Sequence, residues 1–408
     1  MQTRLPASLL ETADGREADA ILRKCVHCGF CNATCPTYQL LGDELDGPRG
    51  RIYLMQQVLE GAPVTSKTQL HIDRCLTCRS CETTCPSGVR YGRLLDIGRQ
   101  HVERMVPRGL WQRAKRKALL MVLPNRPLFG VLLWLGRLTR PLLPGALRSA
   151  VPPLVPAGAW PVARHARRML LLQGCVQPAV APNIDAAAAR VLDRAGISLI
   201  RASGAASCCG ALAHHLCAEE MALEQARRNI DAWWPEIERG AEAVVVTASG
   251  CGTMVKDYCT LLREDPHYAD KAAKVSALFR DLSQAVAAEG AKLPRIMANR
   301  RIAVHSPCSL QHGLQVRGVV EDLLRNAGCT LLPVKDGHLC CGSAGTYSIL
   351  QPELSRQLRG NKLAALEAGD PEQIVTANIG CLTHLGSGSA KPVRHWIEVL
   401  DEALSLSS

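Results

Sequence analysis

Two closely similar cysteine runs decide the fold of the N-terminal part of this chain. CVHCGFCNATCP occupies residues 25–36, and CLTCRSCETTCP occupies residues 75–86. Each run has the pattern C-x2-C-x2-C-x3-C-P. Because the cysteine spacing and the closing proline both return, the two runs are copies of one unit. Between them, RIYLMQQVLE (51–60) has helical spacing and ends at Gly61, so we expect a compact helical domain over residues 1–100.

The repeated run is the ligand pattern of bacterial ferredoxins that hold two [4Fe–4S] clusters. Three cysteines at x2 intervals bind three corners of one cubane, while the fourth is displaced along the chain and reaches the other cluster. Zinc is disfavoured, because zinc sites pair two C-x2-C units or add histidine. The sequence therefore assigns cluster 1 to Cys25, Cys28, Cys31 and Cys85, and cluster 2 to Cys75, Cys78, Cys81 and Cys35.

A second, longer repeat fills the C-terminal part of the chain. VLDRAGISLI (191–200) aligns with LLRNAGCTLL (323–332), and AVVVTASGC (243–251) aligns with QIVTANIGC (373–381). Cysteines and their surroundings repeat together, so we expect two homologous cysteine-rich modules, module 1 over 168–300 and module 2 over 301–408. The repeated cysteines are Cys175, Cys208, Cys209 and Cys251 in module 1, and Cys308, Cys340, Cys341 and Cys381 in module 2.

Each module is expected to alternate strands and helices. In module 1 the apolar runs 169–173, 197–201 and 243–247 predict buried parallel strands, and residues 183–195 and 214–238 predict helices. Every repeated cysteine follows a strand. Because ligand sites form outside the carboxyl ends of parallel strands, these thiols should converge on one edge of each sheet. The fold class is thus multidomain, a helical two-[4Fe–4S] ferredoxin-type domain followed by two α/β modules.

The module cysteines are candidates for one or two further clusters or for redox-active thiols. The alternative is that they are small buried core residues. For Cys217, Cys259 and Cys329, which lie outside the repeated set, we favour this alternative.

Composition narrows the functional classes. The 408 residues include 19 Cys, and the N-terminus lacks the apolar stretch of a secretory signal, so we expect reduced thiolates in the cytosol. Only three Phe, six Tyr and six Trp are present, which disfavours a nucleic-acid partner. There is no P-loop and no G-x-G-x-x-G between a strand and a helix. We therefore expect no FAD or NAD site on this chain, and substrate oxidation on another.

The basic charge of the chain is concentrated between the ferredoxin-type domain and module 1. From His101 to Arg168 there are 13 Lys or Arg and one acid, whereas the remainder carries 35 bases and 36 acids. This segment, 101–167, contains LFGVLLWLG (128–136), which is shorter than the ~20 residues that span a bilayer. A basic segment rich in Leu and Trp predicts an element that lies on a membrane surface or docks a partner.

The modules resemble a known family. LLQGC, SCCGALAHH, HSPCS and CCGSAGTYSILQPELS are similar to the paired cysteine-rich domains of heterodisulfide reductase subunits and of iron–sulfur subunits of flavin-linked dehydrogenases. With the ferredoxin-type domain in front, the whole chain resembles the glycolate oxidase iron–sulfur subunit family. The family motif closes each module with Cys-x2-Cys, but Met254 and His384 replace the last cysteine here. The special non-cubane clusters of the reductases are therefore not carried over.

The histidines near the module cysteines leave alternatives open. His305 and His384 are candidates for extra ligands or for hydrogen-bond donors to sulfur, and a structural role is an equal alternative for His305. For His214, His215 and His338 a structural role is favoured.

The resemblance implies an electron-transfer subunit of an oxidoreductase complex acting on CH–OH donors, with no catalytic residue on this chain. A partner FAD-binding subunit would oxidise glycolate to glyoxylate, and a second flavoprotein-like subunit would complete the complex. This chain would pass the electrons to the respiratory quinone pool. The implied location is cytoplasmic, peripheral on the inner face of the inner membrane.

Three alternatives stay open at this point. The first is the iron–sulfur subunit of a lactate or anaerobic glycerol-3-phosphate dehydrogenase. The second is a disulfide-reductase-type catalytic subunit, and the third is a pair of modules that bind no metal.

Overall fold

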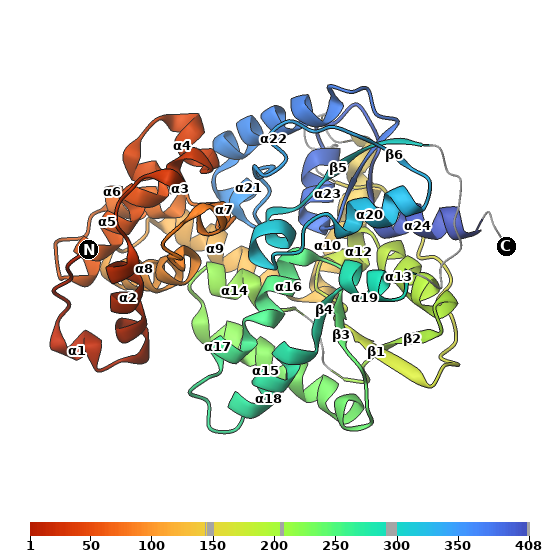
Figure 1. Ribbon diagram of the computed structural model, residues 1–408, viewed down its shortest axis with the longest axis horizontal. Helices are drawn as coiled ribbons and strands as arrows, with labels where there is room; N and C mark the ends of the chain where they lie inside the picture. Colours follow the sequence, from red (N-terminus) through yellow and green to blue (C-terminus); the bar gives the residue numbers. More distant parts are fainter. Residues whose placement is uncertain (143, 145–150, 205–207, 291–299, 406–408) are drawn as a thin grey trace.

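The computed structural model describes residues 1–142, 144, 151–204, 208–290 and 300–405. A helical N-terminal domain lies at one side of the molecule, and two α/β modules, each built on a parallel sheet, make up the rest (Figure 1). The expected fold class is confirmed.

The N-terminal domain is built from short helices around the two cysteine runs. Thr12 caps α2 by accepting a hydrogen bond from the Gly15 amide at 3.0 Å. The expected helix over 51–60 begins earlier, at Pro48, which suits the first turn because it needs no amide hydrogen bond there. The helices are α1 Ala7–Leu10, α2 Ala13–Lys24, α3 Phe30–Ala33, α4 Pro36–Leu41, η1 Glu44–Asp46, α5 Pro48–Leu59, α6 Ser66–Asp73, α7 Ser80–Thr84 and α8 Tyr91–Met105.

Helix α8 closes the core of this domain and leads into the basic segment. It buries Leu94, Leu95 and Ile97 against α5. The basic segment then forms α9 Leu110–Val122, α10 Arg126–Thr139 and η2 Arg140–Leu142. Neither α9 nor α10 buries any residue, so these two helices lie on the surface.

Module 1 contains a four-stranded parallel sheet in the order β2-β1-β3-β4. Met169 lies opposite Leu199, and Val245 lies opposite Arg280. The elements are β1 Arg167–Leu171, α12 Gln177–Val180, α13 Asn183–Arg194, β2 Ile197–Arg201, α14 Ala211–His215, α15 Glu219–Glu238, β3 Val244–Val246, α16 Ser249–Lys256, α17 Tyr258–Leu261, α18 Ala269–Leu278, β4 Phe279–Asp281 and α19 Leu282–Ala288.

Module 2 repeats this topology with the order β6-β5-β7-β8, again all parallel. Its elements are β5 Arg301–His305, the π-helical turn η4 Ser309–Gly313, α20 Val319–Asn326, β6 Thr330–Leu332, α21 Tyr347–Leu350, α22 Pro352–Glu367, β7 Gln373–Thr376, α23 Ile379–Gly386, β8 Val393–His395 and α24 Trp396–Ser405. The same strand order in both modules agrees with their common origin in one repeated unit.

Two details differ from the sequence-based expectation. The helix expected over 214–238 is two helices, α14 and α15, because the chain turns at Cys217, whose φ is 58°. The fourth strands, β4 and β8, were not expected. Each has three residues, too few to show a strand pattern in the sequence.

The two modules share one hydrophobic core, which includes residues of both sheets. Helix α13 of module 1 packs against α24 of module 2, and Arg190 pairs with Asp401 at 2.6 Å across this contact. The N-terminal domain has its own core and contacts both modules. Asp14 and Glu17 of this domain pair with Arg263 of module 1, at 2.7 and 2.8 Å. Its Arg74 carbonyl accepts a hydrogen bond from Tyr347 of module 2 at 3.2 Å.

Candidate iron–sulfur sites

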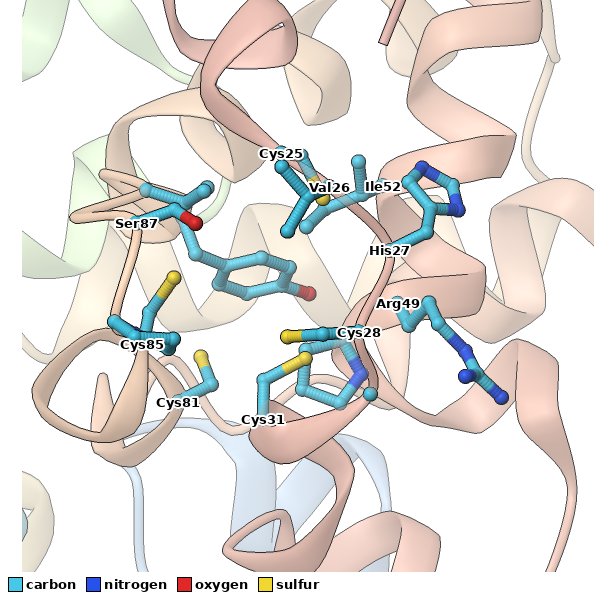
Figure 2. Close-up of a pocket in the computed structure, with 15 residues that line it drawn as sticks. Cys25, Val26, His27, Cys28, Cys31, Arg49, Ile52, Cys81, Cys85 and Ser87 are labelled. Carbon is cyan, nitrogen blue, oxygen red and sulfur yellow. The ribbon is translucent and has the colours of Figure 1, made fainter.

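The cluster 1 cysteines line one cavity. Cys25, Cys28, Cys31 and Cys85 border it, together with Cys81 from the neighbouring set. Figure 2 shows their side chains gathered around this space, with Cys85 arriving from the second run as the spacing predicts. Burial raises the pKa of the Cys25 thiol and raises that of Cys31 to about 11. Neutral thiols are thus favoured without a metal, and a bound cation would supply the charge that holds them as thiolates.

Both cysteine loops adopt the same unusual backbone. Positive φ angles occur at His27 (54°) and Gly29 (85°) in the first loop, and at Thr77 (57°) and Arg79 (58°) in the second. Left-handed residues turn the chain sharply, which lets three cysteines face one space. The structure therefore repeats at the level of dihedral angles, although glycine occupies only one of these four positions.

The cluster 2 cysteines lie deeper. Cys35, Cys75 and Cys81 are buried and Cys78 is half-buried, whereas Cys28 of cluster 1 is exposed. Burial, followed by the neighbouring thiols of Cys78, Cys75 and Cys35, raises the pKa of Cys81 well above its usual value. The Tyr91 hydroxyl donates to Cys75 Sγ at 3.6 Å. Four convergent thiols with a polar donor fit a [4Fe–4S] cluster.

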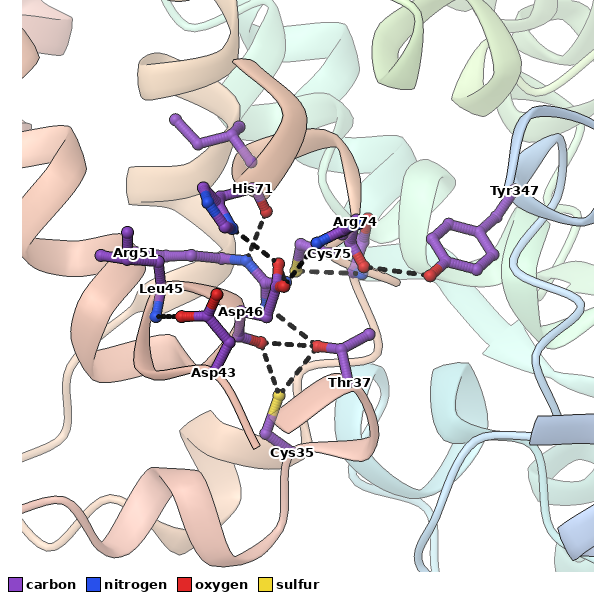
Figure 3. Close-up of polar contacts among 12 residues, drawn as sticks. Cys35, Thr37, Asp43, Leu45, Asp46, Arg51, His71, Arg74, Cys75 and Tyr347 are labelled. Carbon is purple, nitrogen blue, oxygen red and sulfur yellow. Dashed lines mark hydrogen bonds and ion pairs between the residues drawn. The ribbon is translucent and has the colours of Figure 1, made fainter. Parts of the chain in front are cut away.

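A buried charged network supports the Cys35 loop of cluster 2. Asp46 is fully buried and its carboxylate pairs with Arg51 at 3.3 Å, His71 at 3.1 Å and Arg74 at 2.8 Å (Figure 3). The Asp46 backbone carbonyl accepts from Thr37 Oγ1 at 2.7 Å, and Thr37 Oγ1 lies 3.3 Å from Cys35 Sγ. The network thus fixes the loop that carries Cys35, the ligand contributed by the other run.

The module 1 cysteines converge at the carboxyl ends of β1, β2 and β3. Hydrogen bonds between side chains link Cys175 to Cys208, Cys208 to Cys209, and Cys209 to Cys251. The hydrogen bond to Cys208, and then burial, raise the pKa of Cys175 well above its usual value. We call these four thiols the module 1 site.

The module 2 cysteines form an equivalent chain, the module 2 site. Cys308 Sγ lies 3.8 Å from Cys340 Sγ, and side-chain hydrogen bonds link Cys340 to Cys341 and Cys341 to Cys381. Asn378 Nδ2 donates to Cys381 Sγ at 3.4 Å, and Asn378 Oδ1 accepts from the Gly250 amide of module 1 at 3.3 Å. Asn378 therefore joins the segments that carry Cys251 and Cys381. Comparing the two repeats would have drawn attention to it, because module 1 has Ala248 at this place.

The histidines around the modules separate into two kinds. His305 is buried beside the module 2 site, where a ring nitrogen and the sulfurs of Cys341 and Cys381 all lie within 4.8 Å of one another. Burial lowers its pKa to about 3, so the ring is neutral.

His384 instead hydrogen-bonds to Ser355 and to the Cys341 backbone, and Met254 is buried in the core. His214 Nε2 lies 3.3 Å from the Asp96 carboxylate of α8. The backbone carbonyl of His338 lies within hydrogen-bond distance of His312 Nε2, at 3.0 Å. His215 lies next to His214, with ring centroids 5.6 Å apart.

The three cysteines outside the repeats stand apart from these sites. Cys329 is buried in the shared core. Cys217, which follows α14, and Cys259, which lies in α17, are half-buried. None of the three takes part in the thiol chains described above.

Cluster 2 and the module 2 site adjoin each other. Cys78 and Cys308 pack against one apolar group that contains Leu76, Cys340 and Tyr347. Burial, and then the neighbouring Cys308, raise the pKa of Cys78 well above its usual value. Thr83 also contacts His312 of module 2 at 2.9 Å. Because Cys81 of cluster 2 borders the cluster 1 cavity, the cluster 1, cluster 2 and module 2 sites are neighbours in that order.

Helix α10 lies against module 1 near Cys175 and presents apolar side chains outward. Arg126 donates to the Gly174 carbonyl and to Gln173, both at 2.7 Å. Trp134 and Leu138 are 60% and 65% exposed, and Trp111 of α9 is 84% exposed. Within the described residues no single helix is long and apolar enough to cross a membrane. Only Leu110–Val122 and Arg126–Leu142 taken together reach that length, with a bend of 104°.

Comparisons with known proteins place the chain. A family model described as a 4Fe-4S dicluster domain matches residues 21–89, and one described as a cysteine-rich domain matches residues 169–256 and 302–386. The glycolate oxidase iron-sulfur subunit of Escherichia coli K12 is 56% identical over 405 residues, 99% of each chain. This chain belongs to the glycolate oxidase iron–sulfur subunit family.

Other relatives include a second glycolate oxidase subunit and a lactate-related protein. The probable glycolate oxidase iron-sulfur subunit of Bacillus subtilis 168 is 30% identical and covers 90% of this chain and 89% of its own. Lactate utilization protein A of Geobacillus thermodenitrificans is 29% identical and covers 54% of this chain and 92% of its own. Similarity over the full length thus extends to the glycolate oxidase iron–sulfur subunits, and the lactate-related protein matches about half of the chain.

Proposed function

We propose that this chain is the electron-transfer subunit of a membrane-associated glycolate oxidase. In this proposal an FAD-binding subunit oxidises glycolate to glyoxylate, and a second flavoprotein-like subunit completes the complex. Oxidation of the CH–OH group releases two electrons and two protons. The thiolate-held clusters of this chain supply one-electron transfer toward the quinone pool. Full-length similarity to the Escherichia coli subunit supports the glycolate assignment over lactate or glycerol 3-phosphate.

One observation carries the electron-transfer role, the continuity of the thiol sites. Exposed Cys28 marks one end, and Cys78 packs with Cys308 and Cys340 against one apolar group at the other. Two clusters in the N-terminal domain and one in each module fit the donor sets present. The protein contributes burial, fixed loops and the Tyr91 and Asn378 donors, which tune potential without taking part in substrate chemistry.

The exposed end of this route at Cys28 and the α10 surface at module 1 suit different partners. Beside Cys28, the side chains of Val26 and Phe30 are 68% and 62% exposed and form an apolar rim suited to a protein partner. At module 1, α10 presents Trp134 and Leu138 beside basic residues, which suits an anionic membrane surface. We therefore propose that the flavin subunit docks near cluster 1. The chain then lies peripherally on the cytoplasmic face of the inner membrane.

A cysteine replacement in the purified complex tests the relay. In Cys78→Ser, glycolate should still bleach the flavin of the partner, but reduction of a quinone analogue should fall at least tenfold. Cys259→Ser is the matched control, because that thiol lies outside every site. Unchanged quinone reduction in Cys78→Ser would contradict the relay. Faster flavin bleaching by lactate or glycerol 3-phosphate than by glycolate would reassign the substrate.

A further inference from the structure

The two modules differ at one buried position next to their thiols. Alignment of LLLQGC (170–175) with AVHSPC (303–308) places Leu172 of module 1 against His305 of module 2. Alignment of the third strands places Val246 against Thr376. His305 Nδ1 and Thr376 Oγ1 lie 3.0 Å apart. An apolar pair in one module has thus been replaced by a hydrogen-bonded polar pair in the other.

One ring nitrogen of His305, beside the module 2 site, is buried without a hydrogen-bond partner among the described residues. Its side chain is only 2% exposed, and among the residues that the structure describes Nε2 has no hydrogen-bond partner. A buried polar atom left unpaired costs about 1–3 kcal/mol, so such an atom calls for an explanation. The sulfurs of Cys341 and Cys381 lie within 4.8 Å of a nitrogen of this ring, and of each other.

The hydrogen bond to Thr376 prepares His305 for metal binding. When Nδ1–H donates to the Thr376 hydroxyl, Nε2 carries the free lone pair that a metal ligand needs. Ligand histidines in proteins are oriented by a partner of this kind on the other ring nitrogen. His384, at the place of the missing fifth cysteine, hydrogen-bonds to Ser355 and the Cys341 backbone and is not available in the same way.

We propose that His305 Nε2 is a ligand of the metal cluster in module 2, so that the modules hold chemically different redox sites. Module 1 offers four thiolates, and module 2 offers four thiolates and an imidazole. In module 2 the imidazole would bind one iron in place of one of these thiolates, and replacing anionic thiolate by neutral imidazole raises the potential of an iron–sulfur centre. Module 2, which adjoins cluster 2, is then the favoured electron acceptor. This inference rests on the proposed function in one respect, that the modules hold clusters.

Pulsed EPR on anaerobically purified protein with ¹⁵N-labelled histidine tests the ligand directly. The wild type should show nitrogen coupling typical of a bound imidazole, together with iron above the about eight atoms of the two N-terminal clusters. His305→Leu alone leaves Thr376 unpaired, so His305→Leu/Thr376→Val is the decisive variant because it recreates the pair of module 1. It should lose the nitrogen coupling. Its module 2 signal should either move to lower potential or disappear, and in the second case the protein should lose about four iron atoms. His384→Gln is the matched control and should keep the coupling.

Each result decides a different part of the proposal. Coupling that persists in His305→Leu/Thr376→Val would overturn the assignment of His305. Iron above about eight atoms without any histidine coupling in the wild type would also overturn it, and would leave module clusters in place. Iron that saturates at about eight atoms would overturn the module clusters themselves, and with them this inference, while the two-cluster relay would stand.

Discussion

At the scale of single residues, hydrogen bonds to sulfur shape the environment of cluster 2 and of the module 2 site. Tyr91 donates to Cys75 and Asn378 donates to Cys381. Donors of this kind stabilise the more negative, reduced cluster and raise its potential. Tyr91 could not be found from the cysteine motifs, because a donor may come from any element that packs against the sulfur.

Tyr91→Phe should lower the potential of cluster 2. The change removes one hydrogen bond, worth about 1 kcal/mol or about 40 mV for a one-electron couple. An EPR-monitored redox titration measures the shift. Tyr53→Phe is the control, because Tyr53 lies on α5 with half of its surface exposed. An unchanged midpoint in Tyr91→Phe would show that this hydroxyl does not tune the cluster.

The sequence specified the cysteines better than it specified their surroundings. The structure brings the N-terminal cysteines together, because short loops with fixed intervals leave few ways to gather thiols around one space. Their division between two clusters stays a prediction. In contrast, Asp46 supports the Cys35 loop through Arg51, His71 and Arg74, which come from different elements. Such a network depends on tertiary packing, and no local pattern in the sequence marks it.

At the scale of elements, the strands of each module were predictable and some helices were not. Buried apolar runs located β1, β2 and β3 to within a few residues, since a strand inside a parallel sheet is apolar on both faces. The break between α14 and α15 was missed, because Cys217 adopts a left-handed conformation that its residue type does not suggest.

Helix α10 gives the membrane proposal its test. Val131 and Leu138 are 56% and 65% exposed, so replacing both with Glu should leave the fold intact and remove apolar contact with lipid. We expect Val131→Glu/Leu138→Glu to reduce the bound fraction at least tenfold in a flotation assay with vesicles of anionic phospholipid. Each of the two side chains would contribute about 1.5–3 kcal/mol of binding free energy if it were fully buried in lipid, which is enough for a tenfold change in binding.

The control for this helix is a charge added elsewhere. Ile349 of α21 is 48% exposed and lies in module 2, so Ile349→Glu should bind vesicles like the wild type. Equal binding by the α10 variant and the wild type would argue against a membrane-facing role for α10.

At the scale of the whole molecule, the N-terminal domain is docked on both modules. Cys78 meets Cys308 at one contact, and Asp96 of α8 meets His214 of α14 at another, with both partners nearly buried. The sequence predicted which domains are present. It could not predict how they dock, because docking depends on contacts between residues far apart in the chain, such as Arg79 with Asp257 at 2.9 Å.

The Asp96–His214 pair should make this docking depend on pH. Burial opposes both charges, but the neighbouring His214 outweighs it and lowers the pKa of Asp96, while Asp96 raises the pKa of His214. The stability contributed by Asp96 is present above its unfolded pKa of about 4 and is lost as the pH falls. The stability contributed by His214 is fully present below its unfolded pKa of about 6.5. It is lost as the pH rises through the raised pKa of the folded state. The contact should therefore be strongest between about pH 4 and pH 6.5.

His214→Gln tests this window through hydrogen exchange of the α14 amides, corrected for the intrinsic effect of pH. Leaving Asp96 buried without its partner costs about 3 kcal/mol, so protection at pH 5.5 should fall about 100-fold. At pH 9 the wild type loses part of the same pairing, and the difference between the two proteins should shrink. His267→Gln, at an exposed position in module 1, should match the wild type at both pH values. An equal loss of protection at pH 5.5 and pH 9 would mean that His214 acts through packing alone, since only the charged pair carries the dependence on pH.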